Sequence, residues 1–332
     1  MVRTTKLIAG IVLIITLGVG IWIGCVFMDS RTSPLALEKG EWRLGAQKGE
    51  LTNPLLECDL AEETIASKKV DFSPELESFV NEIKKEPSIT DISVYFRDLN
   101  NGPSFGIGQS ETYSPASLLK VPILIAYLKW VEDVPGVLEE EILYEKPINV
   151  RYEQKFTPIT PLIPGTSYTT KALLEQMVTY SDNQALVLLH MKLPPQYQNE
   201  LYTLLGVDPA LITSTSKELT MRQYSIFFRI LFNASFLTRA HSEYALNLLT
   251  KTTFVRGVRA GVPEGIEVAH KFGERKTQGG QQQFHDCGIV YYPDHPYLIC
   301  VMTRGTDATA LIESIQKTSA FVYQQIDSQY GK

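Results

Sequence analysis

Cysteine is scarce in this chain, which has four among 332 residues. Four cysteines are too few for the disulfide framework that stabilises small secreted domains. Cys287 and Cys300 fall on neighbouring predicted strands, where we expect small buried hydrophobic residues. No Cys or His spacing is typical of a metal site, so we expect neither a metal nor another cofactor.

Positive charge is also limited, and the net charge is -6. Lysine and arginine occur singly or in short pairs such as Lys68-Lys69 and Lys84-Lys85. Nucleic-acid binding depends on clustered basic residues that neutralise phosphates, so we expect no nucleic-acid partner.

One long apolar run is present near the start of the chain. Residues 7–28 carry no charge and match the ~20 residues that a membrane-spanning helix needs. Arg3 and Lys6 precede the run, so the positive-inside rule predicts a cytoplasmic tail over 1–6 and an extracytoplasmic body. Two alternatives compete with it. A cleaved signal peptide would normally have a shorter apolar run. A lipoprotein signal could end at Cys25, but Trp22 fits it poorly and the apolar run continues beyond Cys25. We therefore expect a single-pass anchor in the cell membrane.

The remaining chain divides into a linker and one folded domain. Residues 29–70 mix both charge signs with Pro, Gly and Ser and lack a sustained period, which is typical of a stalk. The domain is expected over 71–332. Apolar periodicity predicts strands at both ends of it and helices between them. The strands are expected over 89–99, 104–108, 265–273, 283–292 and 297–304; the helices over 73–86, 170–180, 184–192, 195–205, 217–232, 239–250 and 307–325.

The pattern indicates an α+β fold: one antiparallel sheet assembled from both ends of the domain, flanked by helices, with an inserted all-helical lobe. A cleft is expected where the lobe meets the sheet. For the helix expected over 217–232, Thr215 and Glu218 have the spacing of a capping box.

A further helix is predicted from Ser114, the expected N-cap, with Pro115 at its first position. This start places Ser117 and Lys120 on one face of the first turn. The residues that follow are apolar on nearly every side, which favours a buried central helix. Pro122 is expected to kink it, because the carbonyl four residues earlier loses its donor.

A Ser-x-x-Lys pattern alone is weak evidence for a catalytic pair, and it recurs at 214–217 and 314–317. Two other short motifs follow the copy at Ser117. Ser181-Asp182-Asn183 comes at the end of a predicted helix, and Lys271-Phe272-Gly273 lies in a predicted strand. With the three motifs in this order, the chain from about Ser73 onward resembles the class A β-lactamase and penicillin-binding protein superfamily.

The resemblance implies a β-lactamase/transpeptidase-like fold and an acyl-serine mechanism. Ser117 would attack a carbonyl, and Lys120, kept neutral by burial and nearby positive charge, would take its proton. Ser181 would relay a proton to the leaving nitrogen. Asn183 would hold Lys120 and the substrate amide.

The resemblance also assigns the strand motif to substrate binding. Lys271 would keep Ser181 in place and attract a substrate carboxylate, while Phe272, Gly273 and Glu274 would line the site. The backbone N–H groups of Ser117 and Glu274 would face the developing oxyanion. The implied substrates are small β-lactams or cell-wall peptides ending in D-Ala.

Two departures from the family pattern bear on activity. Class A β-lactamases carry a glutamate after the Ser-Asp-Asn motif that activates water for deacylation, but residues 206–216 contain none, and Asp208 fits a turn. Phe272 also stands where the family usually has Thr or Ser, so a hydroxyl that helps to bind the substrate carboxylate is missing. We therefore expect acylation with slow deacylation.

Two alternatives remain open at this point. A Ser-His-Asp hydrolase could use His285 and Asp286, but adjacent strand residues point to opposite faces, and the chain has no Gly-x-Ser-x-Gly elbow. A β-lactam-binding or peptidoglycan-sensing module without turnover is the second alternative. Replacing Lys120 by Ala distinguishes it, because an enzyme should lose acylation whereas a binding module should keep its affinity.

Overall fold

The computed structural model describes residues 51–53, 71–100, 102–149, 154–204, 206–207, 218–277 and 279–331. The predicted anchor, residues 7–28, lies outside these ranges, as does most of the predicted linker. Within them, no helix is long and apolar enough to cross a membrane. The short described piece of the linker contacts the folded domain: the backbone N–H groups of Leu51 and Thr52 donate to the carboxylate of Glu243 at 2.8 and 3.0 Å.

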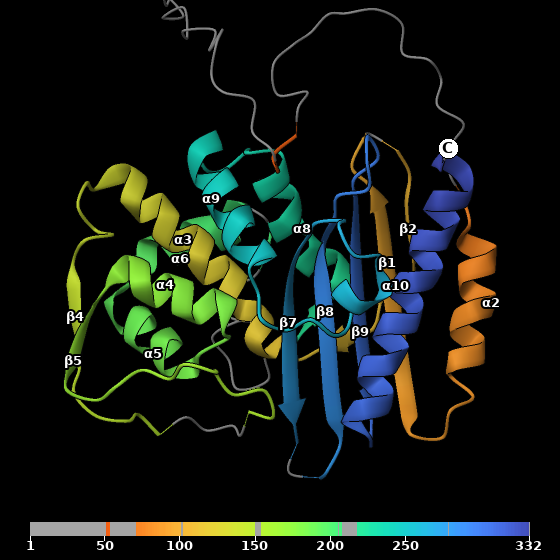
Figure 1. Cartoon of the computed structure of the whole chain (residues 1–332), viewed down its shortest axis with the longest axis horizontal. Helices are drawn as coiled ribbons and strands as arrows, with labels where there is room; N and C mark the ends of the chain where they lie inside the picture. Colours follow the sequence, from red (N-terminus) through yellow and green to blue (C-terminus); the bar gives the residue numbers. More distant parts are fainter. Residues whose placement is uncertain are drawn as a thin grey trace, which may run out of the picture. The chain divides into compact units, whose positions relative to one another are not determined.

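A five-stranded antiparallel sheet carries the fold, as the sequence predicts. Its order is β2 (Ser104–Ile107), β1 (Ile89–Asp98), β9 (Tyr297–Gly305), β8 (Gln282–Val290) and β7 (Val268–Lys276). The first long strand pairs with the last, from Ile89 opposite Gly305 to Asp98 opposite Tyr297. The sheet therefore joins both ends of the domain and leaves β7 as an edge strand next to the helical lobe (Figure 1).

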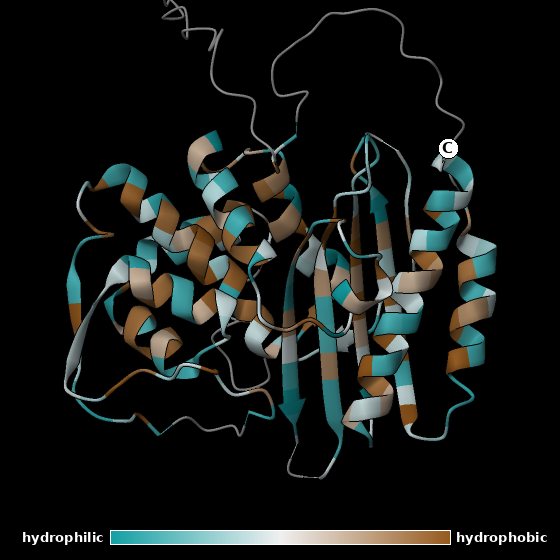
Figure 2. Cartoon of the chain, in the orientation of Figure 1, coloured by the Kyte–Doolittle hydropathy of each residue, from teal (hydrophilic) through white to brown (hydrophobic). Residues whose placement is uncertain are grey.

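Two helices cover one face of the sheet, α2 (Ser73–Ile83) and α10 (Ala308–Tyr330). The apolar side chains of α10 recur at helical spacing and are buried, whereas its other side is hydrophilic (Figure 2). Because helices lie over both faces, β8 and β9 are buried along almost their whole length.

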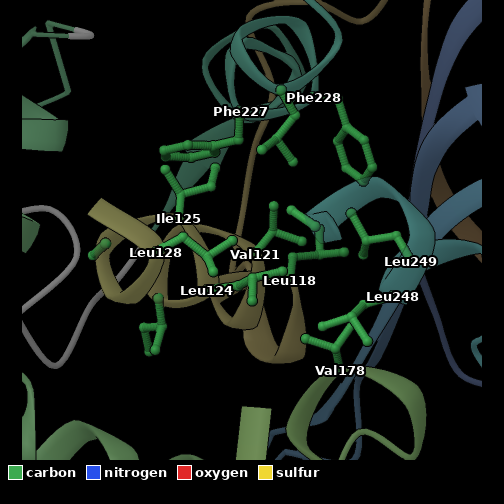
Figure 3. Packing of buried hydrophobic residues seen from close by; sticks show 14 of the residues in the cluster. Leu118, Val121, Leu124, Ile125, Leu128, Val178, Phe227, Phe228, Leu248 and Leu249 are labelled. Carbon is green, nitrogen blue, oxygen red and sulfur yellow. The ribbon is translucent and has the colours of Figure 1, made fainter. Parts of the chain in front are cut away.

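The helices between the strands form the lobe that packs on the other face. They are α3 (Lys120–Asp133), α4 (Thr170–Thr179), α5 (Asn183–Lys192), α6 (Pro195–Leu204), α8 (Met221–Phe232) and α9 (Arg239–Thr250). The nine residues from Lys120 to Leu128 are all buried, which confirms the predicted central helix. Apolar residues of α4, α8 and α9 surround α3 and the short turn before it (Figure 3).

Short elements complete the described fold and were not predicted as strands. β4 (Glu141–Tyr144) pairs with β5 (Thr166–Thr169), and β3 (Thr112–Tyr113) pairs with β6 (Leu219–Thr220). A single 3₁₀ turn, η3 (Arg259–Gly261), precedes β7.

The predicted capping box at Glu218 is wrong. The helix α8 begins at Met221, and its capping box is formed by Thr220 and Gln223. Glu218 instead accepts a hydrogen bond from Thr112 Oγ1 at 2.5 Å. The pairing of β3 with β6 places Thr112 opposite Thr220, two residues beyond Glu218, and keeps the backbone before α8 extended.

The predicted helix start at Ser114 is also wrong. A 3₁₀ turn, η2 (Ala116–Leu119), comes first, and α3 begins only at Lys120. Ala116 has a φ of 48°, in the left-handed region that non-glycine residues rarely adopt. Ser114 Oγ accepts a hydrogen bond from Arg275 on β7 at 2.5 Å. The hydroxyl that was expected to cap the helix therefore binds to the sheet instead.

The expected kink at Pro122 has no cause in this arrangement. Because α3 begins at Lys120, Pro122 lies in the first turn, where helical N–H groups have no partner within the helix. The carbonyl four residues earlier belongs to Leu118, and it accepts from the hydroxyl of Tyr224 at 2.9 Å. A buried tyrosine of α8 thus replaces the donor that the proline lacks.

The expectation of unpaired cysteines is wrong as well. Cys287 and Cys300 form a disulfide between β8 and β9. They are direct partners in the register of the two strands. Four cysteines are too few for a disulfide framework. Whether two of them lie opposite each other depends on the register of β8 and β9.

Tyr224→Phe is expected to lower the free energy of unfolding by about 0.5–1.5 kcal/mol, because it removes the buried hydroxyl that donates to the Leu118 carbonyl and leaves that oxygen only a bond from the Lys120 N–H. Urea unfolding of the two proteins measures the difference. Tyr323→Phe on α10 is the control and should have a smaller effect. Equal stability of Tyr224→Phe and the wild type would contradict the role assigned to this hydrogen bond.

Candidate active site

Three chain segments meet where the helical lobe joins the sheet: the η2–α3 junction, the start of α5 and the edge strand β7. They bring together the side chains of Ser117, Lys120, Ser181, Asn183 and Lys271, in agreement with the sequence-based grouping. Lys120, Ser181 and Lys271 have no exposed surface, while Ser117 is half-buried. A serine hydroxyl within reach of solvent thus lies against a buried polar cluster.

Lys120 is at the centre of this cluster. Its Nζ lies 3.2 Å from Ser117 Oγ, 3.0 Å from Ser181 Oγ, 2.5 Å from the Ser181 carbonyl oxygen and 2.8 Å from Asn183 Oδ1. Four oxygens surround an amine that, when neutral, donates two protons and keeps one lone pair. The lone pair of a neutral Lys120 can accept the proton of Ser117.

The environment of Lys120 favours its neutral form. Complete burial lowers its pKa well below the usual value, and the neighbouring charge of Lys271 lowers it further. Asp182 and Glu274 act in the opposite direction but do not cancel the effect of burial. A neutral amine next to a serine hydroxyl is the arrangement that general-base catalysis needs.

A strained turn presents Ser181 to both lysines. Ser181 has a φ of 55°, in the left-handed region, and this conformation turns its carbonyl and its hydroxyl toward Lys120. Asp182 follows as the N-cap of α5, where Oδ1 accepts from the N–H groups of Gln184 and Ala185 at 2.6 and 3.2 Å. Asp182 therefore fixes the turn, and Ser181 and Asn183 reach the cluster.

Lys271 lies on the other side of Ser181. Its Nζ donates to Ser181 Oγ at 2.9 Å and to the Phe272 carbonyl at 3.0 Å, and it lies 4.0 Å from the centre of the Phe272 ring. Burial lowers the pKa of Lys271 to about 7, although the charges of Asp286 and Glu274 oppose this. Ser181 is thus shared by two lysines whose pKa values are both lowered.

Ser114 fastens the Ser117 turn to the sheet through all its polar atoms. Its N–H donates to Gln283 Oε1 at 3.0 Å, its hydroxyl accepts from Arg275, and its carbonyl lies 3.0 Å from His285 Nε2. Burial lowers the pKa of His285 to about 3, so the ring is neutral. Since His285 Nδ1 accepts from Thr303 N–H at 3.3 Å, Nε2 carries the proton and donates to Ser114.

Gly273 allows β7 to approach the same turn. A Cβ at this position would lie 2.9 Å from the Pro115 carbonyl oxygen and 3.1 Å from Leu118 N, which is too close for a side chain. The backbone of the edge strand therefore lies directly against η2, with Glu274 as its next residue.

Sequence reasoning missed a segment that connects the two sides of the site. Gln154 Nε2 donates to the Ser181 carbonyl at 2.9 Å, and the N–H groups of Lys155 and Phe156 donate to Glu274 Oε1 at 2.9 and 3.0 Å. The segment belongs to a Pro- and Gly-rich stretch with no motif, so nothing in the sequence indicated this contact. Burial raises the pKa of Glu274, whereas the two N–H groups oppose that rise.

Aromatic rings fill the space beside these contacts. Phe272 is 3% exposed and stacks on Phe254 with a centroid distance of 4.2 Å. Phe156 packs edge-on against Phe254, Phe272 and Phe284, at centroid distances of 5.0, 5.8 and 5.8 Å. The side chain of Phe272 thus belongs to an apolar cluster rather than to a polar binding surface.

A polar cavity of about 310 Å³ extends from Glu274 along the ends of β7 and β8. Its lining includes Gln154, Lys155, Arg275, Lys276 and Gln282. The cavity therefore adjoins the segment that connects the two sides of the site, and it offers amide and cationic groups to a ligand.

The alternative catalytic residues are engaged elsewhere. His285 does not pair with Asp286; His270 does, with its Nδ1 2.9 Å from Asp286 Oδ1, and both residues are buried. In the Ser-x-x-Lys copy on α10, Ser314 is buried and donates to the Leu311 carbonyl. Among the described residues, no group of three or more His, Cys, Asp or Glu side chains could hold a metal ion.

A sheet assembled from both ends of the domain and an inserted helical lobe define a fold of the β-lactamase type. The model of the beta-lactamase enzyme family matches residues 75–326, and the chain belongs to this family. No curated protein sequence matches the chain.

Solved structures agree on the fold. The structure of PBP-A matches with a TM-score of 0.65 and 21% identity, over 77% of this chain and 97% of that chain. A class A beta-lactamase from Mycobacterium abscessus matches with a TM-score of 0.64 and 22% identity, over 76% and 99% of the two chains. A PBP-A mutant, solved as its acyl-enzyme complex with penicillin G, matches with a TM-score of 0.64 and 21% identity, over 78% and 99%. The TM-scores establish a shared fold.

The lowered pKa of Lys271 predicts a stability that rises with pH. Between pH 7 and 9 the unfolded chain keeps this lysine protonated, because its ordinary pKa is 10.5, whereas the folded chain releases the proton above about pH 7. The unfolded state then binds more protons, so the free energy of unfolding increases with pH, by up to about 1.4 kcal/mol per unit for one such group.

Urea unfolding at pH 7, 8 and 9 checks this expectation. Lys271→Met should reduce the slope of stability against pH relative to the wild type. Lys192→Met, which removes an exposed lysine from α5, should leave the slope as it is. Equal slopes for the wild type and Lys271→Met would contradict a lowered pKa at Lys271.

Proposed function

We propose that this protein is a serine hydrolase that attacks an amide carbonyl through Ser117 and forms an acyl-enzyme with β-lactams or cell-wall peptides. The observation that carries the proposal is the 3.2 Å contact between Ser117 Oγ and the buried amine of Lys120. Membership of the beta-lactamase enzyme family supports it. The similar structure of a PBP-A mutant as an acyl-enzyme with penicillin G supports acyl-serine chemistry on this fold.

In the proposed acylation step, neutral Lys120 takes the proton of Ser117 as its oxygen bonds to the carbonyl carbon. The oxyanion is stabilised by the N–H groups of Ser117 and Glu274; the close approach at Gly273 brings that part of β7 against the Ser117 turn. Ser181 contacts both lysines. As the amide bond breaks, it gives its own proton to the leaving nitrogen and receives in exchange the proton that Lys120 took from Ser117. Asn183 holds Lys120 and meets the substrate amide.

Deacylation is proposed to be slow. The carboxylates of the described site are engaged, because Asp182 caps α5 and Glu274 accepts two backbone N–H groups. Residues 208–217, which contain Asp208, lie outside the described part of the chain. The sequence there has no glutamate to activate water, and a missing general base typically slows such a step by about 100- to 10,000-fold.

The domain is proposed to lie outside the cytoplasm, tethered by residues 7–28. The uncharged run of ~20 residues supports an anchor. The disulfide between Cys287 and Cys300 supports an oxidising compartment, because disulfides are rare in the cytosol. Both observations suit an enzyme whose substrates belong to the cell wall.

The protein, mixed with excess benzylpenicillin, is expected to form a covalent adduct on Ser117 that persists for longer than an ordinary turnover. Intact mass spectrometry over time measures its formation and loss. Ser117→Ala should form no adduct. Lys120→Ala should form it about 100- to 10,000-fold more slowly, because the general base is lost.

Lys317→Ala is a matched control, since this exposed lysine belongs to the Ser-x-x-Lys copy on α10 and should leave the rate unchanged. A protein that only binds or senses the ligand would keep its affinity in Lys120→Ala and gain no mass. Rapid Ser117-dependent hydrolysis would refute slow deacylation and point to a base that the sequence does not reveal.

A further inference from the structure

The ammonium group of Lys271 is fully used inside the protein. An ammonium has three N–H donors. In this structure Ser181 Oγ, the Phe272 carbonyl and the face of the Phe272 ring account for three directions around Nζ. The side chain has no exposed surface. Lys271 can therefore position Ser181, but it has no donor left for an anionic group of a substrate.

Lys120 offers no charge to a ligand either. Its Nζ is enclosed by oxygens of Ser117, Ser181 and Asn183, and burial holds its pKa well below the usual value. Neither of the two lysines at the nucleophile thus presents an accessible positive charge.

Asp182 acts more strongly on Lys120, and Asp286 acts more strongly on Lys271, but both carboxylates are buried and bound within the protein. The carboxylate on β7 next to the Ser117 turn belongs to Glu274. It follows Gly273, whose backbone touches the Ser117 turn, and it is half-buried. Its charge is strong enough at Lys120 and at Lys271 to oppose the lowering of both pKa values. A charge in a partly desolvated position acts more strongly on a ligand than the same charge in water.

One cation of β7 contacts the Ser117 turn itself, because Arg275 donates to Ser114 Oγ and is bound there within the protein. Lys276 follows it on the strand and is exposed, and Lys155 lines the same cavity as Glu274. Along β7, Glu274 therefore comes between Lys276 and Gly273, which contacts the Ser117 turn. On the other side, Phe272 adds an apolar ring rather than a hydroxyl donor.

We propose that Glu274 is a specificity-determining residue that selects acyl donors with a neutral or cationic group next to the scissile bond and disfavours donors with a carboxylate there. The proposal rests on the acyl-Ser117 chemistry proposed above and narrows its substrates. Among cell-wall peptides, those whose leaving residue is amidated or carries an amine are favoured. β-Lactams with a free carboxylate acylate the protein, but slowly.

A pair of thioesters tests the proposal. Both contain the same N-acylglycine, and the leaving group is thioglycolate in one and thioglycolamide in the other, so they differ by one carboxylate. The loss of thioester absorbance gives the Ser117-dependent rate, with Ser117→Ala as the blank. The full chain should react with the neutral donor at least about tenfold faster than with the charged donor, because the carboxylate of Glu274 repels the carboxylate of the charged donor.

Glu274→Gln keeps an oxygen acceptor for the N–H groups of Lys155 and Phe156 but removes the charge. It should bring the ratio of the two rates toward one. Glu77→Gln, which removes the same charge from the exposed side of α2, is the matched control and should leave the ratio of the wild type unchanged.

The outcomes separate this inference from the function on which it rests. A faster reaction with the charged donor, or a ratio that Glu274→Gln leaves unchanged, overturns the role of Glu274 while acyl-Ser117 chemistry stands. The absence of Ser117-dependent reaction with either donor overturns the proposed function and this inference with it.

Discussion

Two buried lysines on either side of one serine hydroxyl are the constraint on which the site depends. Lys120 and Lys271 both contact Ser181 Oγ, and neither has exposed surface. Burying an ammonium is costly unless it loses its proton or finds partners. The protein uses both solutions, because both pKa values are lowered and oxygens surround each amine. Ser181 adopts its left-handed backbone conformation in the turn that makes these contacts.

The rest of the fold holds these three groups together. The turn that carries Ser117 is joined to the sheet by Ser114, whose polar atoms are bound by Gln283, Arg275 and His285. The close approach at Gly273 brings the edge strand against that turn. Because the first and last long strands pair with each other, both ends of the domain must fold before the site is complete.

Sequence reasoning located the chemistry better than the connections. The three motifs named side chains that the structure brings together, and the apolar run after Lys120 predicted the central helix, because each depends on local spacing. The true helix start, the disulfide and the contact of Glu274 with the segment 154–156 depend on register or on residues far apart in sequence. Nothing in the local sequence specifies such pairings. The hydroxyl of Ser114, for example, was expected to cap a helix but accepts a hydrogen bond from Arg275 on β7.

The same electrostatics that favour a neutral Lys120 bear on the substrate selectivity that we propose. Burial and the charge of Lys271 both lower the pKa of Lys120, and Lys271 is itself buried, with its amine bound to Ser181 and to the Phe272 carbonyl. In the proposed mechanism, an amine bound in this way positions Ser181 and is not offered to a substrate carboxylate. Glu274 is a half-buried carboxylate beside the Ser117 turn, held by two backbone N–H groups, while Arg275 is bound to Ser114. The proposed selectivity against a carboxylate thus has the same physical origin as the neutral Lys120, because both depend on amines that are buried and bound within the protein.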